Sequence, residues 1–459
     1  MNLIHKIKNA PREVLKDRIL LFSIIIFVWA LTELLEILIP EKILNFLPGP
    51  FQIGLLFVIF FFLTIYSIVV YIVQRRKFRS ERDIKILNEN YPSVDIFIAA
   101  HNEDSVIVET LQNILEIDYP NFKITIIDDR SKDQTSKVIE DFLNENSELR
   151  NKVKLTTRLE GQTPGKAASL NEALENSLAE YILVCDADAK IDPICLKRAI
   201  PFFSSANNIA AIQFQKRISN TNYNVLTLCQ DLEMAFDTYI QSGKEALKGF
   251  VELRGNGQLF SRKALLDVKG WDERTLTEDL EISIRFQIQG WRIIFVPEIH
   301  VYEEAVITAT ALLKQRKRWI EGSLRRFLTH FHSFISPRNK LTLLQRLDVF
   351  PFVIQFAVPV WLFLDIFMQI VYFINHQPTS IPLLTAAIIV ISLLFWINII
   401  IGIRYWRRKY SFSRSLTYGS LAFLYGIIQW PTLVIWSMRK VLFSRNTTKW
   451  VKTPRMAEK

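Results

Sequence analysis

The sequence predicts an α/β domain with a mostly parallel sheet, set between hydrophobic helices that cross a membrane. Two observations lead to this fold class. Between residues of about 80 and 335 the composition is mixed, and short apolar runs alternate with stretches of helical periodicity, as in sheets covered by helices on both faces. On either side lie largely apolar runs of roughly 20 residues, the length that spans a bilayer. The chain has 459 residues, half of them apolar, so it has room for both parts.

Three strands and three helices are expected in the first half of the mixed region. The strands are expected at residues 94–100, 124–127 and 181–185, and the helices at 105–115, 136–143 and 167–178. Ligands of parallel sheets bind beyond the carboxyl ends of the strands. Acidic residues gather at those ends, where Glu103 follows the first strand, Asp128 and Asp129 the second, and Asp186 and Asp188 the third. One polar rim is therefore predicted.

Asp186 and Asp188 are the candidate metal ligands. One residue apart at the end of a strand, they present both carboxylates on one face, and hard oxygen ligands suit Mg²⁺ or Mn²⁺. A metal held in this way keeps positions open for a substrate pyrophosphate. The alternative is a solvated turn after a buried strand. For three other polar residues near the strand ends the alternative is a helix cap: Asn102, Ser131 and Asp133.

Two further motifs contribute a lysine and a carboxylate. Lys166 follows Gly165 at the start of a helix, where free backbone amides and an ammonium group suit a phosphate or a nucleotide. The phosphate-loop pattern of ATPases is absent. Thr277, Glu278 and Asp279 begin another helix, which Thr277 is expected to cap and whose dipole favours both acids. Asp279 is also a candidate to accept a proton from an attacking hydroxyl.

A basic helix just before the C-terminal apolar runs contributes a third group. Gln315, Arg318 and Trp319 are three or four residues apart and share one helix face. An indole beside a guanidinium suits a sugar ring or a lipid head group close to a pyrophosphate. Four other cations fit an interfacial helix whose long side chains extend toward lipid head groups: Lys314, Lys317, Arg325 and Arg326.

Five apolar runs are long enough to cross a bilayer: residues 19–39, 51–73, 349–374, 381–403 and 416–438. Basic residues cluster before the first run and after the second, so by the positive-inside rule the N-terminus and the central domain face the cytosol. The basic tail conflicts with five full spans. We therefore expect the last run to be re-entrant or interfacial, because four residues interrupt it: Gly419, Gly426, Gln429 and Pro431.

These patterns divide the chain into four parts: a membrane region with two spans at 1–78, a catalytic domain at 79–335, a second membrane region of two to three segments at 336–440, and a basic tail at 441–459. The net charge of +10 comes largely from clusters beside the apolar runs, where anionic lipid attracts basic residues. This placement argues against a nucleic-acid partner. Three cysteines without metal-type spacing suit a reduced cytosolic domain: Cys185, Cys195 and Cys229.

The order of the motifs resembles one enzyme family. A His-Asn-Glu, an Asp-Asp, a Gly-Lys-Ala, an Asp-x-Asp, a Thr-Glu-Asp and a Gln-x-x-Arg-Trp precede a membrane segment, as in the membrane-bound enzymes of glycosyltransferase family 2. This family includes cellulose, hyaluronan and poly-N-acetylglucosamine synthases and certain lipid glucosyltransferases. The resemblance covers roughly residues 90–335 and the flanking runs. It implies a cytosolic GT-A domain, a UDP-sugar donor, inversion at the anomeric carbon, and Mg²⁺ or Mn²⁺ as cofactor.

The resemblance also implies a role for each motif residue. Asp128 or Asp129 would contact the uridine, with Glu103 and Lys166 nearby, and Asp186 would bind the nucleotide. Asp188, with Asp186, would bind the metal, and Gln315 and Arg318 would hold the diphosphate. Trp319 would bound the acceptor site, and Asp279 would be the general base. Two residues depart from the family pattern. His101 stands where the family usually has tyrosine, and Ala168 replaces a common glycine, both at the donor side.

Two acceptors remain open. The Gln-x-x-Arg-Trp motif is common in processive synthases that extend and export a β-linked polymer. The segments Gly255-Asn-Gly-Gln258 and Arg318-Trp-Ile-Glu-Gly-Ser323 instead look like those of cyanobacterial-type monoglucosyldiacylglycerol synthases, which favours a membrane lipid such as diacylglycerol, with glucose as the sugar. A non-catalytic scaffold is disfavoured because the acids of the metal site and the base are all present. A transporter is disfavoured because the ionisable residues concentrate between the apolar runs.

Overall fold

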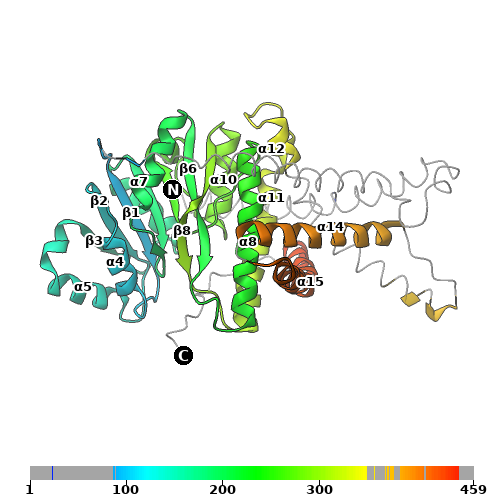
Figure 1. The fold of residues 1–459 in the computed structure, drawn as a ribbon. Helices are drawn as coiled ribbons and strands as arrows, with labels where there is room; N and C mark the ends of the chain where they lie inside the picture. Colours follow the sequence, from blue (N-terminus) through cyan, green and yellow to red (C-terminus); the bar gives the residue numbers. More distant parts are fainter. Residues whose placement is uncertain are drawn as a thin grey trace.

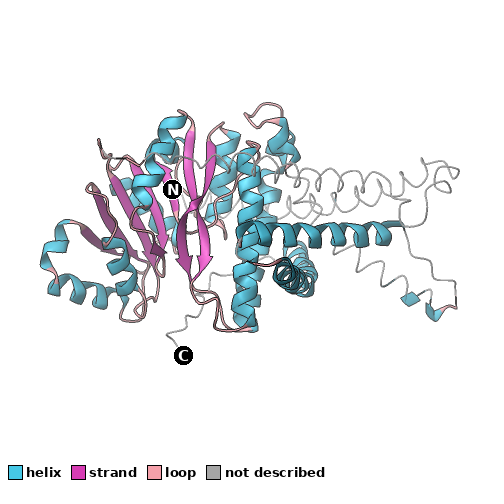
Figure 2. Cartoon of the chain, in the orientation of Figure 1, coloured by secondary structure: helices cyan, strands magenta, loops and turns pink. Residues whose placement is uncertain are grey.

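The computed structural model describes residues 86–87, 89–348, 383–407 and 410–443, with a few isolated positions elsewhere. Eight strands form one sheet in the order β3-β2-β1-β4-β7-β6-β8-β5 (Figure 1). Helices cover both faces of this sheet, and two long C-terminal helices lie to one side of it (Figure 2). The predicted α/β class is therefore confirmed.

The elements follow each other as an alternation of strands and helices. The strands are β1 (Val94–Ala100), β2 (Phe122–Asp128), β3 (Val153–Thr157), β4 (Tyr181–Asp186), β5 (Lys190–Ile191), β6 (Ile209–Ile218), β7 (Gln258–Ser261) and β8 (Arg292–Glu303). The α-helices are α4 (Ile107–Leu115), α5 (Thr135–Glu145), α6 (Lys166–Asn176), α7 (Cys195–Ala199), α8 (Val225–Ala246), α9 (Arg262–Asp267), α10 (Glu278–Ile288), α11 (Ala309–Ile335), α12 (Leu343–Leu347), α14 (Leu383–Trp406) and α15 (Phe412–Phe443). Two short 3₁₀ helices are η2 (Ser147–Asn151) and η3 (Ile200–Ser205).

The sheet has a parallel half and a mixed half. In the parallel half β1 pairs with β2 and β4, and β2 pairs with β3. In the mixed half β7 runs antiparallel to both β4 and β6, whereas β6 and β8 are parallel. Because β7 enters the sheet opposite the end of β4, with Gln258 facing Val184, the turn before β7 lies at the carboxyl end of β4. This reversal brings a second chain segment to the rim of the sheet.

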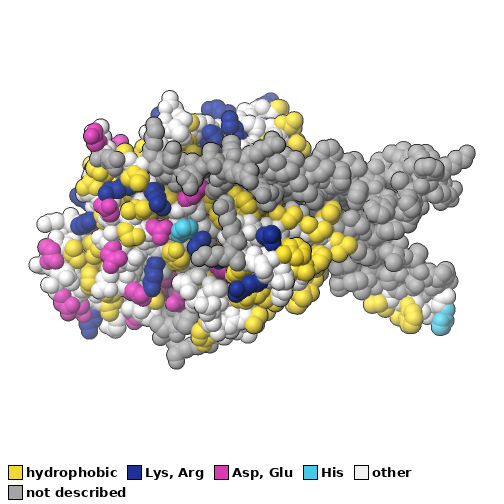
Figure 3. Space-filling model, viewed as in Figure 1, with side chains coloured by type: hydrophobic (Ala, Val, Ile, Leu, Met, Phe, Trp, Pro, Cys, Tyr) yellow, Lys and Arg dark blue, Asp and Glu magenta, His cyan; other side chains and the backbone are white. Residues whose placement is uncertain are grey.

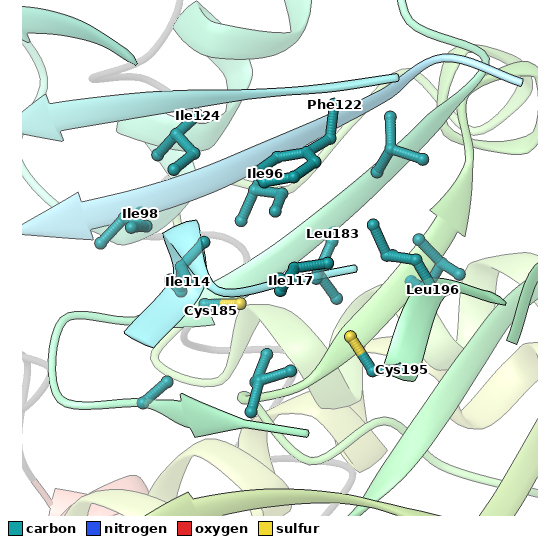
Figure 4. Packing of buried hydrophobic residues seen from close by; sticks show 14 of the residues in the cluster. Ile96, Ile98, Ile114, Ile117, Phe122, Ile124, Leu183, Cys185, Cys195 and Leu196 are labelled. Carbon is teal, nitrogen blue, oxygen red and sulfur yellow. The ribbon is translucent and has the colours of Figure 1, made fainter. Parts of the chain in front are cut away.

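Alternating side chains place an apolar layer on each face of the sheet. On one face Ile96 and Ile98 of β1 join Leu183 and Cys185 of β4 and the inner sides of α4 and α5 (Figure 4). On the other face Phe97 packs with the alternate residues of β4 and with α6, α9 and α10. The strands are thus buried on both sides, as their nearly continuous apolar sequences require.

Helix α8 and helix α11 separate the sheet from the C-terminal helices. Both α14 and α15 pack against α8, and α15 also packs against α11. In Figure 1, α14 extends away from the sheet while α15 is seen nearly end-on. Figure 3 shows hydrophobic side chains gathered beside the C-terminal helices, whereas charges of both signs are spread over the α/β domain.

Within the described residues, one helix combines the length and the apolar composition of a membrane span, namely α15 (Phe412–Phe443); the apolar stretch Ser392–Trp406 of α14 is shorter. The predicted runs at 19–39 and 51–73 lie outside the described residues, as does most of 349–374. The run at 381–403 corresponds to α14. Helix α15 is continuous through Pro431, so the four residues expected to interrupt this segment do not break it.

Two local predictions are corrected by the structure. Helices α4 and α5 begin after Val106 and Gln134, so Asn102, Ser131 and Asp133 do not act as their N-caps. Instead the Asn102 side chain accepts a hydrogen bond from the Lys132 N–H (2.7 Å) and joins two loops. Thr277 does occupy the N-cap position of α10, but its hydroxyl makes no capping hydrogen bond. That hydroxyl faces α11 instead.

Candidate active site

Three strand ends align at one edge of the sheet and carry the predicted rim. The pairing places Ala100 beside Asp128, and Ala99 beside Asp186. The carboxyl ends of β1, β2 and β4 therefore stop at the same level, and the side chains that follow them converge. This alignment is a consequence of the parallel pairing.

Lys166 lies at the centre of the first group of side chains. Its ammonium donates to Asp186 Oδ1 (2.5 Å) and to the Gly255 carbonyl (2.8 Å), and it lies 3.6 Å from Glu278 Oε1. Burial would lower the pKa of Lys166, but attraction from Asp186 and Glu278 outweighs burial and raises the pKa. The lysine is therefore a fixed positive charge at the end of β4, beside the first turn of α10.

Asp279 is the carboxylate with the properties of a base. Burial and the negative charge of Glu278 raise the pKa of Asp279 to about 6, against the opposing attraction of Lys166 and Arg254. A general base works best when its pKa lies near the working pH. The Gly255 backbone lies against this carboxylate, since a methyl group on Gly255 would come within 3.3 Å of Asp279 Oδ2.

Arg318 of α11 faces the same group of acids. Burial lowers the pKa of Arg318, whereas Glu278, Asp186 and Asp279 attract its charge and act in the opposite direction. A close contact between helices sets this position: a methyl group on Gly322 would lie 2.6 Å from Thr277 Cγ2. Only a glycine lets α11 approach the start of α10 so closely. The structure thus brings together Lys166, Asp186, Asp279 and Arg318, which the sequence predicts to share a site.

Asp128 and Asp129 form a second group at the end of β2. Asp129 accepts from Arg130 (2.9 and 3.1 Å), from Arg158 (2.9 Å) and from the Gly165 N–H (2.8 Å). Burial would raise the pKa of Asp129, but these hydrogen bonds and charges outweigh it and lower the pKa. Asp128 accepts from the Ser131 N–H (2.9 Å) and from Ser136. Because Gly165 directly precedes Lys166, the two groups are joined through the start of α6.

The remaining candidates of the rim are placed by their elements. Glu103 is buried beyond the end of β1, and its N–H donates to Thr135 Oγ1 (2.8 Å). Asp188 is 9% exposed, two residues past the end of β4. Within the part of the chain that the structure describes, no three His, Cys, Asp or Glu side chains gather closely enough to hold a metal alone. A pair of carboxylates fits the way Mg²⁺ is bound when substrate phosphates and water complete its shell.

Trp319 belongs to a different environment from Arg318. The Arg316 guanidinium lies 4.2 Å from the centre of the Trp319 ring, and the Lys216 ammonium lies 5.7 Å from it. Arg316 itself is buried and bound to Glu233 of α8 (2.6 Å). Gln315 is partly buried one turn before Trp319 on the same helix.

The interfacial interpretation of two cations of α11 is wrong. Arg326 is buried and donates to Glu252 (2.8 Å), so it does not extend toward lipid. Arg325 binds Glu321 of its own helix (2.9 Å). Lys314, in contrast, is exposed. Helices α10 and α15 pack against α11, so both arginines lie close to carboxylates within the protein.

The sequence did not reveal two arginines of this site. Arg158, just after β3, binds both Asp129 and Glu172. Arg254, next to Gly255, binds Asp237 of α8. A single arginine beside a short strand or a glycine carries no signal of its partners, which lie far along the chain. Only the presence of nearby carboxylates in the predicted rim hints at a need for cations.

Comparisons with known proteins identify a family and two relatives. A family model described as "Glycosyltransferase like family 2" matches residues 92–322. A protein of Trichormus variabilis named beta-monoglucosyldiacylglycerol synthase is 31% identical over 379 residues, which cover 80% of this chain and 78% of that protein. A protein of Staphylococcus epidermidis named poly-beta-1,6-N-acetyl-D-glucosamine synthase is 28% identical over 283 residues, 61% of this chain and 67% of that protein.

A solved structure shares the fold. It is a mannosyltransferase from Pyrobaculum calidifontis in complex with GDP-mannose and Mn²⁺, which superimposes with a TM-score of 0.56 at 18% identity over 85% of this chain and all of that one. The prediction of a GT-A-like domain is thereby confirmed at the level of the fold. Together with the family match and the 31% identical relative, it leads to one conclusion: this chain belongs to glycosyltransferase family 2.

Proposed function

We propose that the protein transfers glucose from UDP-glucose to the hydroxyl of a diacylglycerol, forming a β-linked glycolipid on the cytosolic side of a membrane. The observation that carries the chemistry is Asp279, whose pKa of about 6 suits a base and whose neighbours Lys166 and Arg318 suit a diphosphate. The choice of acceptor is supported by similarity to proteins named beta-monoglucosyldiacylglycerol synthase along most of the chain.

Each group of the rim has a role in this proposal. Asp128 and Asp129, with Glu103 nearby, bind the uridine. Lys166, Gln315 and Arg318 hold the diphosphate, and Trp319 bounds the acceptor site. Asp186 and Asp188 hold a divalent cation, Mg²⁺ or Mn²⁺, which when bound neutralises charge on the diphosphate. Support for the cation comes from these two acids at one strand end and from the Mn²⁺ in a protein of the same fold.

The reaction is a single displacement at the anomeric carbon. Asp279 accepts the proton of the acceptor hydroxyl as its oxygen bonds to the anomeric carbon from the face opposite the diphosphate. The bond from that carbon to the phosphate oxygen breaks, and UDP leaves with both bonding electrons. Lys166 and Arg318 stabilise the charge that develops on the departing diphosphate. Displacement from the opposite face inverts the configuration and gives the β linkage.

The membrane arrangement of the proposal follows the four predicted parts of the chain. A cytosolic catalytic domain at 79–335 lies between membrane regions at 1–78 and 336–440, with a basic tail at 441–459, and the protein is an integral membrane protein with several spans. Within the described part, the apolar helices α14 and α15 on one side of the domain support contact with a bilayer.

The proposal is tested with purified full-length protein in liposomes containing diacylglycerol, Mg²⁺ and radiolabelled UDP-glucose. The products are separated into an organic phase and an insoluble residue, and alkaline stability and glycosidase digestion define the linkage. We expect one labelled glycolipid in the organic phase, lost in Asp279→Asn and retained in Asp141→Asn, an exposed aspartate of α5. Label in an insoluble polymer would instead identify a processive synthase.

A further inference from the structure

The turn before β7 contacts Lys166 and Asp186, two charged residues at the centre of the site. The Gly255 carbonyl accepts from Lys166 (2.8 Å), and the Asn256 side chain accepts from the Asp186 N–H (3.1 Å). On its other side the Gly255 backbone lies against the Asp279 carboxylate. A shift of this turn therefore moves the lysine and the base together. The position of the turn therefore depends on contacts with residues outside the site.

Arg254 connects this turn to α8. Its guanidinium binds the Asp237 carboxylate through two nitrogens (2.7 and 3.1 Å), and a third contact reaches Glu252 (3.3 Å). Its backbone N–H donates to Gln213 Oε1 of β6 (2.7 Å). A planar guanidinium bound in this two-pronged way fixes direction as well as distance. Arg254 is thus held through both its main chain and its side chain.

The same set of contacts continues to the helix that carries the base. Glu252 also binds Arg326 of α11 (2.8 Å), and Arg326 donates to the Leu280 carbonyl in the first turn of α10 (3.2 Å). Burial would raise the pKa of Glu252, but attraction from Arg326 and Arg254 outweighs it and lowers the pKa. The network therefore joins α8, α10, α11 and the Gly255 turn, with Glu252 held in its charged form.

We propose that Arg254 is a positioning residue for the transfer reaction: held by Asp237, it fixes the Gly255 turn against Lys166 and Asp279. The inference rests on the proposed function, because it takes Asp279 as the base. Arg254 acts through the turn and through its charge and is assigned no contact with the substrate. This role explains why one arginine next to a glycine is bound by two carboxylates.

The charge of Arg254 predicts an effect on the pH profile of the reaction that a purely structural residue would not have. The ionisable groups that act on Asp279 come from four segments: Glu278 of α10, Lys166 of α6, Arg254 before β7, and Arg318 of α11. Glu278 raises the pKa of Asp279, and the cations oppose it. Loss of the Arg254 cation must therefore raise that pKa and move the acid side of the pH profile to higher pH. A purely structural residue would leave the profile in place.

The experiment compares Arg254→Gln, Arg254→Lys and Asp237→Asn in full-length protein in diacylglycerol liposomes. UDP release is measured against UDP-glucose concentration and pH, so that kcat and KM are separated. Arg407→Gln is the matched control, because Arg407 binds another carboxylate of α8, Asp231, and follows α14; loss of this buried pair lowers stability, so the kcat of every variant is referred to its folded fraction, measured by thermal unfolding. Asp237→Asn leaves the Arg254 charge in place and keeps the test open if Arg254→Gln fails to fold.

We expect Arg254→Gln to lower kcat by about tenfold or more and to change the KM for UDP-glucose by less than about threefold. The acid limb of the pH profile should move to higher pH. Arg254→Lys should restore the position of the acid limb but only part of kcat. Asp237→Asn should lower kcat without moving the limb upward. The matched control should retain kcat.

Three results would overturn this role: wild-type kcat in Arg254→Gln, a loss confined to KM, or an equal loss of kcat in Arg407→Gln. Failure of the proposed function looks different. In that case the wild-type protein itself forms no glycolipid, or Asp279→Asn remains active, whatever the Arg254 variants do.

Discussion

Gly322→Ala tests whether the approach of α11 to α10 sets the position of Asp279, the proposed base. The new methyl carbon would lie 2.6 Å from Thr277 Cγ2, 2.9 Å from Thr277 Oγ1 and 3.2 Å from Leu276 Cβ. Carbon atoms in contact prefer about 3.5–4.0 Å, so Thr277 must move by roughly 1 Å. Thr277 precedes α10, and Asp279 follows it by two residues. The substitution therefore displaces the base without touching it.

The expected effects on stability and on rate differ in size. Alanine in a helix is favoured over glycine by about 1 kcal/mol, whereas overpacking of a filled core costs about 1–3 kcal/mol. The free energy of unfolding should therefore fall by only about 0–2 kcal/mol. A misplacement of about 1 Å can cost on the order of 100-fold in rate, so kcat should fall by about 10- to 100-fold.

The measurement pairs the kcat for UDP release with thermal unfolding in detergent. Gly426→Ala is the control, since a methyl group there meets nothing within 4 Å and only the helix preference changes. The control should be as active as the wild type and slightly more stable. A Gly322→Ala variant with wild-type kcat, or with the same gain in stability as the control, would refute the reasoning.

Four further predictions concern the charges of the site. The kcat/KM should fall as the pH drops through about 6, where Asp279 takes up its proton, and Glu278→Gln should move this midpoint downward, as profiles between about pH 5 and 8 will show. The raised pKa of Asp279 means that the folded state resists ionisation of this carboxyl. The carboxyl therefore contributes most to stability below its ordinary pKa of 3.8, and this contribution is lost as the pH rises through about 6. Asp279→Asn should therefore be more stable than the wild type at neutral pH by about 1–2 kcal/mol, with the gain shrinking toward pH 4 in unfolding experiments. Lys166→Met should raise the KM for UDP-glucose by about tenfold, because one charge-assisted contact to the diphosphate is lost. Chelation of divalent cations should abolish transfer, and titration with Mg²⁺ should restore it at higher concentrations in Asp188→Asn than in the wild type.

The sequence predicts the parallel half of the sheet well. The strand expected at 94–100 has the bounds of β1, and that at 181–185 ends one residue before β4 does. Both are short apolar runs buried on two faces, for which the local pattern suffices. The other half escapes the same reasoning. β7 has four residues and owes its place to antiparallel pairing with β4 and β6, which no local pattern records.

The candidate site shows the same division. The acids and Lys166 occupy strand ends and helix starts, so their position follows from the chain order of the elements. The partners of Asp129 and Asp279 do not. Arg158 binds Asp129 from the end of the neighbouring strand β3, Arg254 acts on Asp279 from the turn before β7, and the approach of α11 to α10 depends on Gly322 lying against the Thr277 side chain. Such contacts are set by packing in three dimensions.

Three carboxylates of α8 point to three different parts of the molecule. Asp231 binds Arg407 just after α14, Glu233 contacts Arg316 of α11 and Tyr425 of α15, and Asp237 binds Arg254 beside the candidate site. A shortened version of the enzyme that ends after α11 would lose the cation that binds Asp231 and would uncover the apolar residues that α8 presents to α14 and α15, among them Leu232 and Phe236. The transferase domain is thus not a freely separable module, and its expression and engineering are tied to the helices that follow it.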